Sequence, residues 1–73
     1  MAKFPDRLWS LRIAACMTQQ ELADTINTRR RAVAYWESGK VQPTSESIVL
    51  LAVYFNVSAD YLLGLTDQKK TIV

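Results

Sequence analysis

The chain has 73 residues, with nine basic and seven acidic side chains, one cysteine, two glycines and no histidine. This length holds one small core, and the composition removes most general-base, metal-ligand and phosphate-loop sites, so we expect a single domain that is not an enzyme and has no cofactor, metal ion or small-molecule substrate. A lone cysteine forms no internal disulfide, and no signal peptide or 18-residue apolar run is present, so we expect a cytoplasmic protein without a membrane partner.

The first predicted helix begins at Pro5 and Asp6, because proline suits the first helical turn and an acidic residue suits the positive end of the helix dipole. Trp9 and Ile13 form an apolar pair on its outer side, and the sequence gives them no role. Its predicted inward face is made of Leu8, Leu11 and Ala15.

The second predicted helix follows Thr18, and Glu21 three residues later completes the pairing of a capping box. Asn27 tolerates the left-handed backbone that ends a helix abruptly, so we expect a sharp turn there. The core-facing side of this helix contains Leu22, Ala23 and Ile26.

The third predicted helix ends near Ser38, because Gly39 suits the left-handed position after a helix. On a helical wheel its residues separate into two faces. The inward face holds Ala32, Val33 and Trp36, and the opposite face holds Arg30, Arg31, Ala34 and Tyr35.

The outer face of the third helix suits the DNA major groove. Arg30 and Arg31 are the predicted base-reading residues, because a guanidinium can bind the O6 and N7 of guanine together. Tyr35 can contact a thymine methyl or a phosphate, and Ala34 allows close approach. Residues 28–44 have a net charge of +3, whereas the rest of the chain has −1.

A solvated helix start without any partner is the alternative interpretation of Arg29, Arg30 and Arg31. Cations at a helix N-terminus oppose the macrodipole at about 0.3 to 1 kcal/mol each. Three such residues in succession therefore favour a functional explanation.

Arg12 lies in the inward arc of the first helix. A guanidinium directed at a core needs a partner, and Glu37, at the edge of the apolar side of the third helix, is the best candidate. We therefore predict an ion pair that fixes the third helix against the first, with two unrelated surface charges as the alternative.

Thr44 can cap a fourth helix, and Ser58 with Asp60 starts a short fifth one that runs through Leu63 to Gly64. All five predicted elements are helical, so the fold class is all-α. The domain spans residues 1–67, and 68–73 form a flexible tail. The inward face of the fourth helix comprises Ile48, Leu51, Ala52 and Phe55.

The fourth helix also has more apolar residues than one inward stripe needs. Two interpretations are open: the fifth helix and the tail cover the surplus, or the surplus forms a self-complementary surface for a homodimer. These candidate dimer residues are Val49, Leu50, Val53 and Tyr54.

The segment TQQELADTINTRRRAVAYWESGK, residues 18–40, resembles the Cro and lambda-repressor-like helix-turn-helix family. The resemblance extends from Arg7 to Asp67 and includes NVSADYLLGLTD at 56–67. It implies a compact five-helix DNA-binding domain whose helices 2 and 3 form the helix-turn-helix, and it implies the pair of Arg12 with Glu37. It places Arg29 with the groove residues named above and assigns backbone contacts to Gln19, Lys40, Gln42 and Thr44.

The chain departs from the family pattern around the turn. The family often has glycine where Asn27 and Cys16 stand, and a serine or threonine cap where Arg29 stands. Thr28 is therefore a second candidate cap, which would move the helix start by one residue. We expect Thr28 and Arg29 to contact the DNA backbone, and a cysteine at positive φ to be mildly strained.

These residues predict a transcriptional regulator that binds double-stranded DNA at a specific sequence, most simply a repressor acting as a dimer on a palindromic operator. The alternative is an antitoxin-like or adaptor module that binds a protein through the apolar surface of the fourth helix.

Overall fold

The structure is a computed structural model that describes residues 2–70. In chain order its helices are α1 (Phe4–Ala14), α2 (Gln19–Thr25), α3 (Arg30–Ser38), α4 (Ser45–Phe55) and α5 (Ala59–Leu62). The predicted all-α, five-helix fold is confirmed. Residues 71–73 of the expected tail lie outside the described residues, and the flexibility of that tail stays a prediction.

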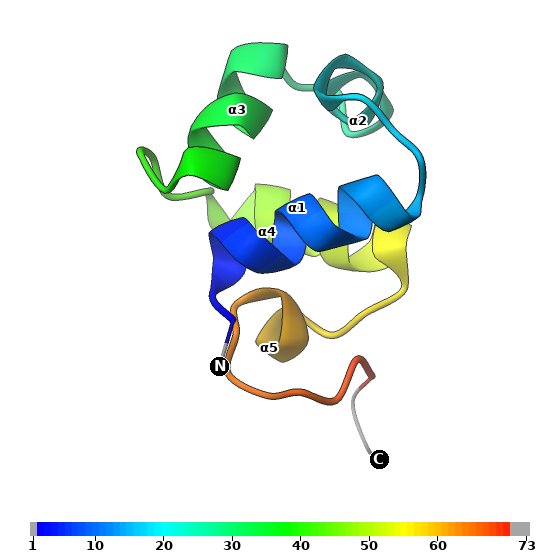
Figure 1. Ribbon diagram of the computed structural model, residues 1–73, viewed down its shortest axis with the longest axis vertical. Helices are drawn as coiled ribbons and strands as arrows, with labels where there is room; N and C mark the ends of the chain where they lie inside the picture. Colours follow the sequence, from blue (N-terminus) through cyan, green and yellow to red (C-terminus); the bar gives the residue numbers. More distant parts are fainter. Residues whose placement is uncertain (1, 71–73) are drawn as a thin grey trace.

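The helices α2 and α3 lie at one end of the long axis, α1 crosses the middle and α5 lies at the other end (Figure 1). Helix α3 packs against both α1 and α2, and α5 packs against α1 and α4. Because α1 contacts α3 on one side and α5 on the other, it is the element that holds the two ends together.

The core is built from all five helices. Each contributes at least one aliphatic side chain with no solvent exposure, and the largest of these are Leu8, Leu22, Val33, Leu51 and Leu62. Burying an aliphatic side chain of this size stabilises a fold by about 1.5 to 3 kcal/mol. Such a core is small, as expected for this length.

Most helix boundaries follow from local signals. Thr18 forms the predicted capping box, because its Oγ1 accepts from the Glu21 N–H at 3.0 Å and its own N–H donates to Glu21 Oε1 at 2.8 Å. Asn27 has φ 57° and Gly39 has φ 78°, so both predicted left-handed stops are confirmed. Thr44 and Ser58 cap α4 and α5 as predicted.

Two expectations about the core-facing helices are wrong. Ala15 is exposed rather than inward, because α1 ends at Ala14 and Cys16 turns the chain away with φ 57°. Helix α5 ends at Leu62, earlier than predicted, and the left-handed residue Gly64 follows two positions later.

Arg7 joins α1 to the C-terminal part of the domain, which the sequence did not predict. Its Nη1 donates to the carbonyl oxygens of Tyr61 at 3.4 Å and Thr66 at 3.2 Å. Its Nη2 donates to Asp67 Oδ1 at 2.8 Å, and its guanidinium lies 3.9 Å from the centroid of the Tyr61 ring. The guanidinium therefore holds the segment after α5 in place.

Candidate nucleic-acid interface

The turn between α2 and α3 ends at Arg29, which is the N-cap of α3 and makes no side-chain capping hydrogen bond. The alternative in which Thr28 caps the helix is therefore wrong, and α3 begins at Arg30. Arg29, Arg30 and Arg31 are all exposed. Three cations thus stand at the open N-terminal end of α3, where they are free to contact a partner.

The rest of α3 follows the helical wheel in part. Val33 and Trp36 are buried in the core as predicted, whereas Ala32, predicted to face inward, is half-buried like Ala34 and Tyr35 on the opposite face. An open hollow of about 480 Å³ lies along one flank of α3, and we call it the flank hollow. Its lining includes Thr28, Arg29, Arg31, Tyr35 and Val41. The structure thus gathers four predicted DNA-contacting residues there, while Arg30 and Ala34 are not among the lining residues.

Lys40 lies beside this flank at the end of α3. Its Nζ is 4.8 Å from the centroid of the Tyr35 ring, a cation–π contact that the sequence did not predict. Gly39 makes the contact possible, because its left-handed backbone reverses the chain just before Lys40. Val41, the next residue, lines the flank hollow, which the sequence did not predict either.

The other two predicted backbone-contacting residues of this loop lie apart from the flank hollow. Gln42 is exposed and lines a separate hollow of about 390 Å³ together with Lys3 and Gly64. The Thr44 hydroxyl oxygen accepts from the Ser47 N–H at 3.1 Å, so it is engaged as the cap of α4.

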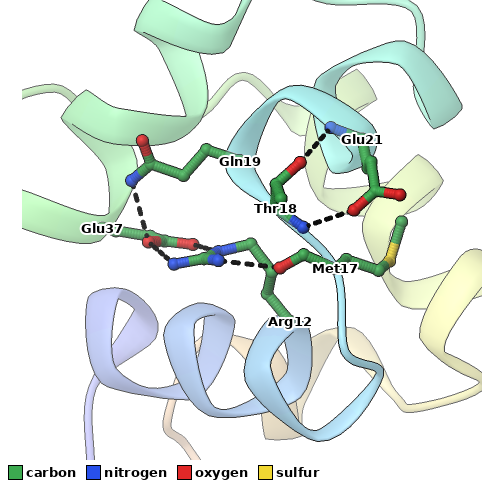
Figure 2. A network of polar contacts seen from close by, with 6 residues as sticks. All are labelled: Arg12, Met17, Thr18, Gln19, Glu21 and Glu37. Atoms are coloured by element: carbon green, nitrogen blue, oxygen red, sulfur yellow. Dashed lines mark hydrogen bonds and ion pairs between the residues drawn. The ribbon is translucent and has the colours of Figure 1, made fainter.

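Arg12, Glu37 and Gln19 form one network between three helices (Figure 2). Arg12 Nε donates to Glu37 Oε2 at 2.6 Å and Nη2 to Glu37 Oε1 at 2.9 Å, so the ion pair is bidentate. The side chains are 11% and 5% exposed. Arg12 Nη1 also donates to the carbonyl oxygen of Met17 at 2.8 Å, and Gln19 Nε2 donates to Glu37 Oε1 at 3.2 Å.

This network fixes both helices of the helix-turn-helix to α1. Hydrogen bonding to Glu37 and its negative charge raise the pKa of Arg12, against the burial that lowers it. Gln19 is the first residue of α2, and Glu37 lies in the last turn of α3. Their hydrogen bond, together with the ion pair of Glu37 with Arg12, therefore holds the start of α2 beside the end of α3.

The candidate dimer surface on α4 is open to solvent. Val49, Leu50, Val53 and Tyr54 have exposed fractions of 58%, 44%, 75% and 45%. The interpretation in which α5 and the tail bury them is wrong for the part of the chain that the structure describes. Trp9 and Ile13 on α1 are exposed as well.

Other kinds of site find little support between residues 2 and 70. That stretch contains no group of three or more acidic, cysteine or histidine side chains placed to hold a metal ion. None of the helices there is both long and apolar enough to cross a bilayer.

A family model described as helix-turn-helix matches residues 10–62. The chain belongs to the Cro and lambda-repressor-like helix-turn-helix family. The matched residues therefore form the helix-turn-helix domain that DNA-binding transcriptional regulators of this family carry.

Two relatives illustrate the range of this family. The chain is 38% identical over 62 residues to the HTH-type transcriptional activator BcrR of Enterococcus faecalis. The aligned residues make up 85% of this chain and 30% of that protein. The chain is 33% identical over 73 residues to the cryptic phage CTXphi transcriptional repressor RstR of Vibrio cholerae serotype O1, covering 97% and 65%. The chain thus spans less than two thirds of either relative.

Solved structures show the same helix-turn-helix fold. A transcriptional regulator from Listeria innocua superposes with a TM-score of 0.83 at 30% identity, covering 97% of this chain and 64% of that one. The P22 c2 repressor in complex with a synthetic operator superposes with a TM-score of 0.81 at 24% identity, covering 86% and 96%.

Proposed function

We propose that this domain represses transcription by binding a roughly palindromic operator as a homodimer in the cytoplasm. The observation that carries the proposal is the exposed row of Arg29, Arg30 and Arg31 at the open end of α3. Since cations at a helix N-terminus are unfavourable by about 0.3 to 1 kcal/mol each, an anionic partner explains why three stand there. Duplex DNA is the anion that a short exposed helix of this width fits.

In this proposal Arg30 and Arg31 read base edges in the major groove, with Tyr35 and Ala34 beside them. The N-terminal residues of a recognition helix are the ones that reach the bases when a preceding helix presents it. The residues proposed to contact the sugar–phosphate backbone are Gln19, Thr28, Arg29, Lys40, Gln42 and Thr44.

The exposed face of α4 supports the dimer. A twofold dimer uses the same patch on both copies, and Val49, Leu50, Val53 and Tyr54 form such an apolar patch on one helix. Two copies would place two α3 helices on half-sites about one helical turn, ~10 bp, apart. A dimer bound at an operator that overlaps a promoter would block that promoter sterically, so repression needs no activity beyond DNA binding.

Selection of bound sequences from a random pool of duplex DNA tests this proposal. We expect the wild-type chain to select a palindromic site, and Arg30→Ala or Arg31→Ala each to relax the preference at one position in each half-site by about 1 to 3 kcal/mol. Equal losses of affinity for specific and random DNA in both variants would remove these arginines from base reading. A reporter promoter that overlaps the selected site then separates repression from activation.

The exposed α4 face also favours a second candidate, an antitoxin-like or adaptor module that binds another protein there. This function needs none of the three arginines. Fluorescence anisotropy with mixed duplex DNA at low salt distinguishes the two, because an adaptor would show no binding at micromolar protein.

A further inference from the structure

We propose that Lys40 is a positioning residue for Tyr35, so that the loop after the recognition helix helps to set base preference. The inference rests on the proposed DNA-binding function and deepens it. The Lys40 Nζ lies 4.8 Å from the centroid of the Tyr35 ring. A cation at this distance over a ring face is attracted by the ring quadrupole.

The backbone holds Lys40 over the ring. Gly39 adopts φ 78°, and the Lys40 N–H then donates to the Tyr35 carbonyl oxygen at 2.9 Å. The Val41 N–H donates to the same oxygen at 3.4 Å. Lys40 is therefore tied by its main chain to the residue whose ring its side chain covers, which distinguishes the contact from an accidental meeting of two surface side chains.

Tyr35 is well placed for its orientation to matter. It lines the flank hollow beside Arg31, which lies one helical turn earlier and is a proposed base-reading residue. The ring is half-buried, so its position is only partly fixed by packing. A cation over one of its faces therefore restricts which orientations the ring presents to a base pair.

The contact leaves Lys40 able to bind DNA. An ammonium group has three N–H donors, and contact with the ring face takes up only one side of the group, so the donors on the other side remain available for a phosphate. Lys40 can then touch a phosphate and the Tyr35 ring together, which links the position of the DNA backbone to the position of a base-reading side chain. A lysine that contacted a phosphate alone would carry no sequence information.

The test compares base-preference profiles, measured by selection from a random duplex pool, for the wild type and four variants: Tyr35→Ala, Lys40→Ala, Lys40→Arg and the double alanine variant. We expect Tyr35→Ala to flatten one position, and Lys40→Ala to reduce the preference at that same position about two- to fivefold. Lys40→Arg should restore it, since arginine also stacks on aromatic rings. The double variant should be no flatter there than Tyr35→Ala.

Two results would overturn the inference: a Lys40→Ala profile identical to the wild type with lower affinity for every sequence, or a change at a position that Tyr35→Ala leaves alone. Arg29→Ala is the matched control, because Arg29 is another exposed cation beside the flank hollow with no cation–π contact to Tyr35. It should lower the affinity for all sequences equally.

A measurement without DNA separates this inference from the proposed function. In the free domain, the ring current of Tyr35 should move the NMR signals of the Lys40 ε-methylene upfield, and Tyr35→Ala should abolish the shift. Absence of the shift would overturn the inference even if the domain binds DNA. Its presence in a domain that binds no DNA would contradict the proposed function and leave Lys40 without a role in base preference.

Discussion

Arg7 and Arg12 both lie on α1 and are both buried, yet their guanidinium groups have very different partners. Arg12 makes two hydrogen bonds to a carboxylate, that of Glu37, whose side chain is only 5% exposed. Arg7 faces two carbonyl oxygens, an aromatic ring and the carboxylate of Asp67, whose side chain is 79% exposed. The carboxylate that pairs with Arg12 is buried, whereas the one that pairs with Arg7 is at the surface and is supplemented by main-chain carbonyl oxygens and an aromatic ring.

This difference concerns what each arginine does for the domain. The Arg12 pair joins α1 to the recognition helix, so it supports the proposed DNA-binding end. Arg7 joins α1 to α5 and residues 66–67 at the opposite end (Figure 1). A buried charge that loses its only counter-charge is costly, whereas one with several dipolar partners loses them one at a time.

The largest expected effect is that of Glu37→Ala, which leaves the Arg12 guanidinium buried without a counter-charge. We expect the free energy of unfolding to fall by about 3 to 5 kcal/mol, measured by urea denaturation. The paired variant Arg12→Met with Glu37→Leu is the control, and it should recover most of the loss because no charge remains buried. A loss below about 1 kcal/mol in Glu37→Ala would show that the pair is effectively solvated.

A smaller loss, about 1 to 3 kcal/mol, is expected for Arg7→Ala, because the carbonyl oxygen of Thr66 loses its side-chain donor and that of Tyr61 keeps only the Gly64 N–H. Thermal unfolding followed by circular dichroism measures it. Arg7→Lys keeps the charge but loses the planar fork of donors, so it should recover only part of the stability. Full recovery would mean that charge alone accounts for the role of Arg7.

Asp67→Ala should change the free energy of unfolding by less than about 1 kcal/mol, since the carboxylate is largely in water. Urea denaturation at low and high salt measures it, and any loss should shrink as salt rises. An effect as large as that of Glu37→Ala would erase the contrast between the two arginines.

The smallest change in stability is expected for Gln19→Ala. Glu37 keeps both bonds from Arg12 in this variant, so the free energy of unfolding should move by no more than about 0.5 kcal/mol. DNA affinity should nevertheless fall on every sequence, because Gln19 is proposed to contact a phosphate. Titration of specific and random duplexes measures this, and unchanged affinity on both would remove Gln19 from the interface.

The sequence predicted features whose causes are local. Thr18 and Glu21, three residues apart, specify the start of α2. Gly39 specifies the end of α3, and its N–H donates to the carbonyl oxygen of Trp36, three residues earlier. The two faces of α3 follow from its period alone, which is why Val33 is buried and Arg31 exposed.

Apart from the Arg12–Glu37 pair, features that depend on distant segments were missed. Arg7 lies about 140° around α1 from Arg12, so the two arginines flank the apolar stripe that contains Leu8 and Leu11. This placement could have indicated that Arg7, like Arg12, is buried and needs a partner. Its partners, however, are more than 50 residues away, and nothing local identifies carbonyl oxygens as acceptors. The contact of Lys40 with Tyr35 depends on the chain reversal at Gly39, which a helical wheel does not describe.

Asn27 turns the chain between α2 and α3 with φ 57°, a left-handed conformation that glycine adopts without steric cost. Glycine reaches the same conformation but has many others available, so it loses more freedom when it is fixed. An asparagine therefore restricts the unfolded chain more than a glycine would, so the turn forms at a smaller cost in conformational entropy. The entropy of setting the turn is lost when the domain folds rather than when it docks, and affinity gained through such preorganisation needs no additional contact with DNA.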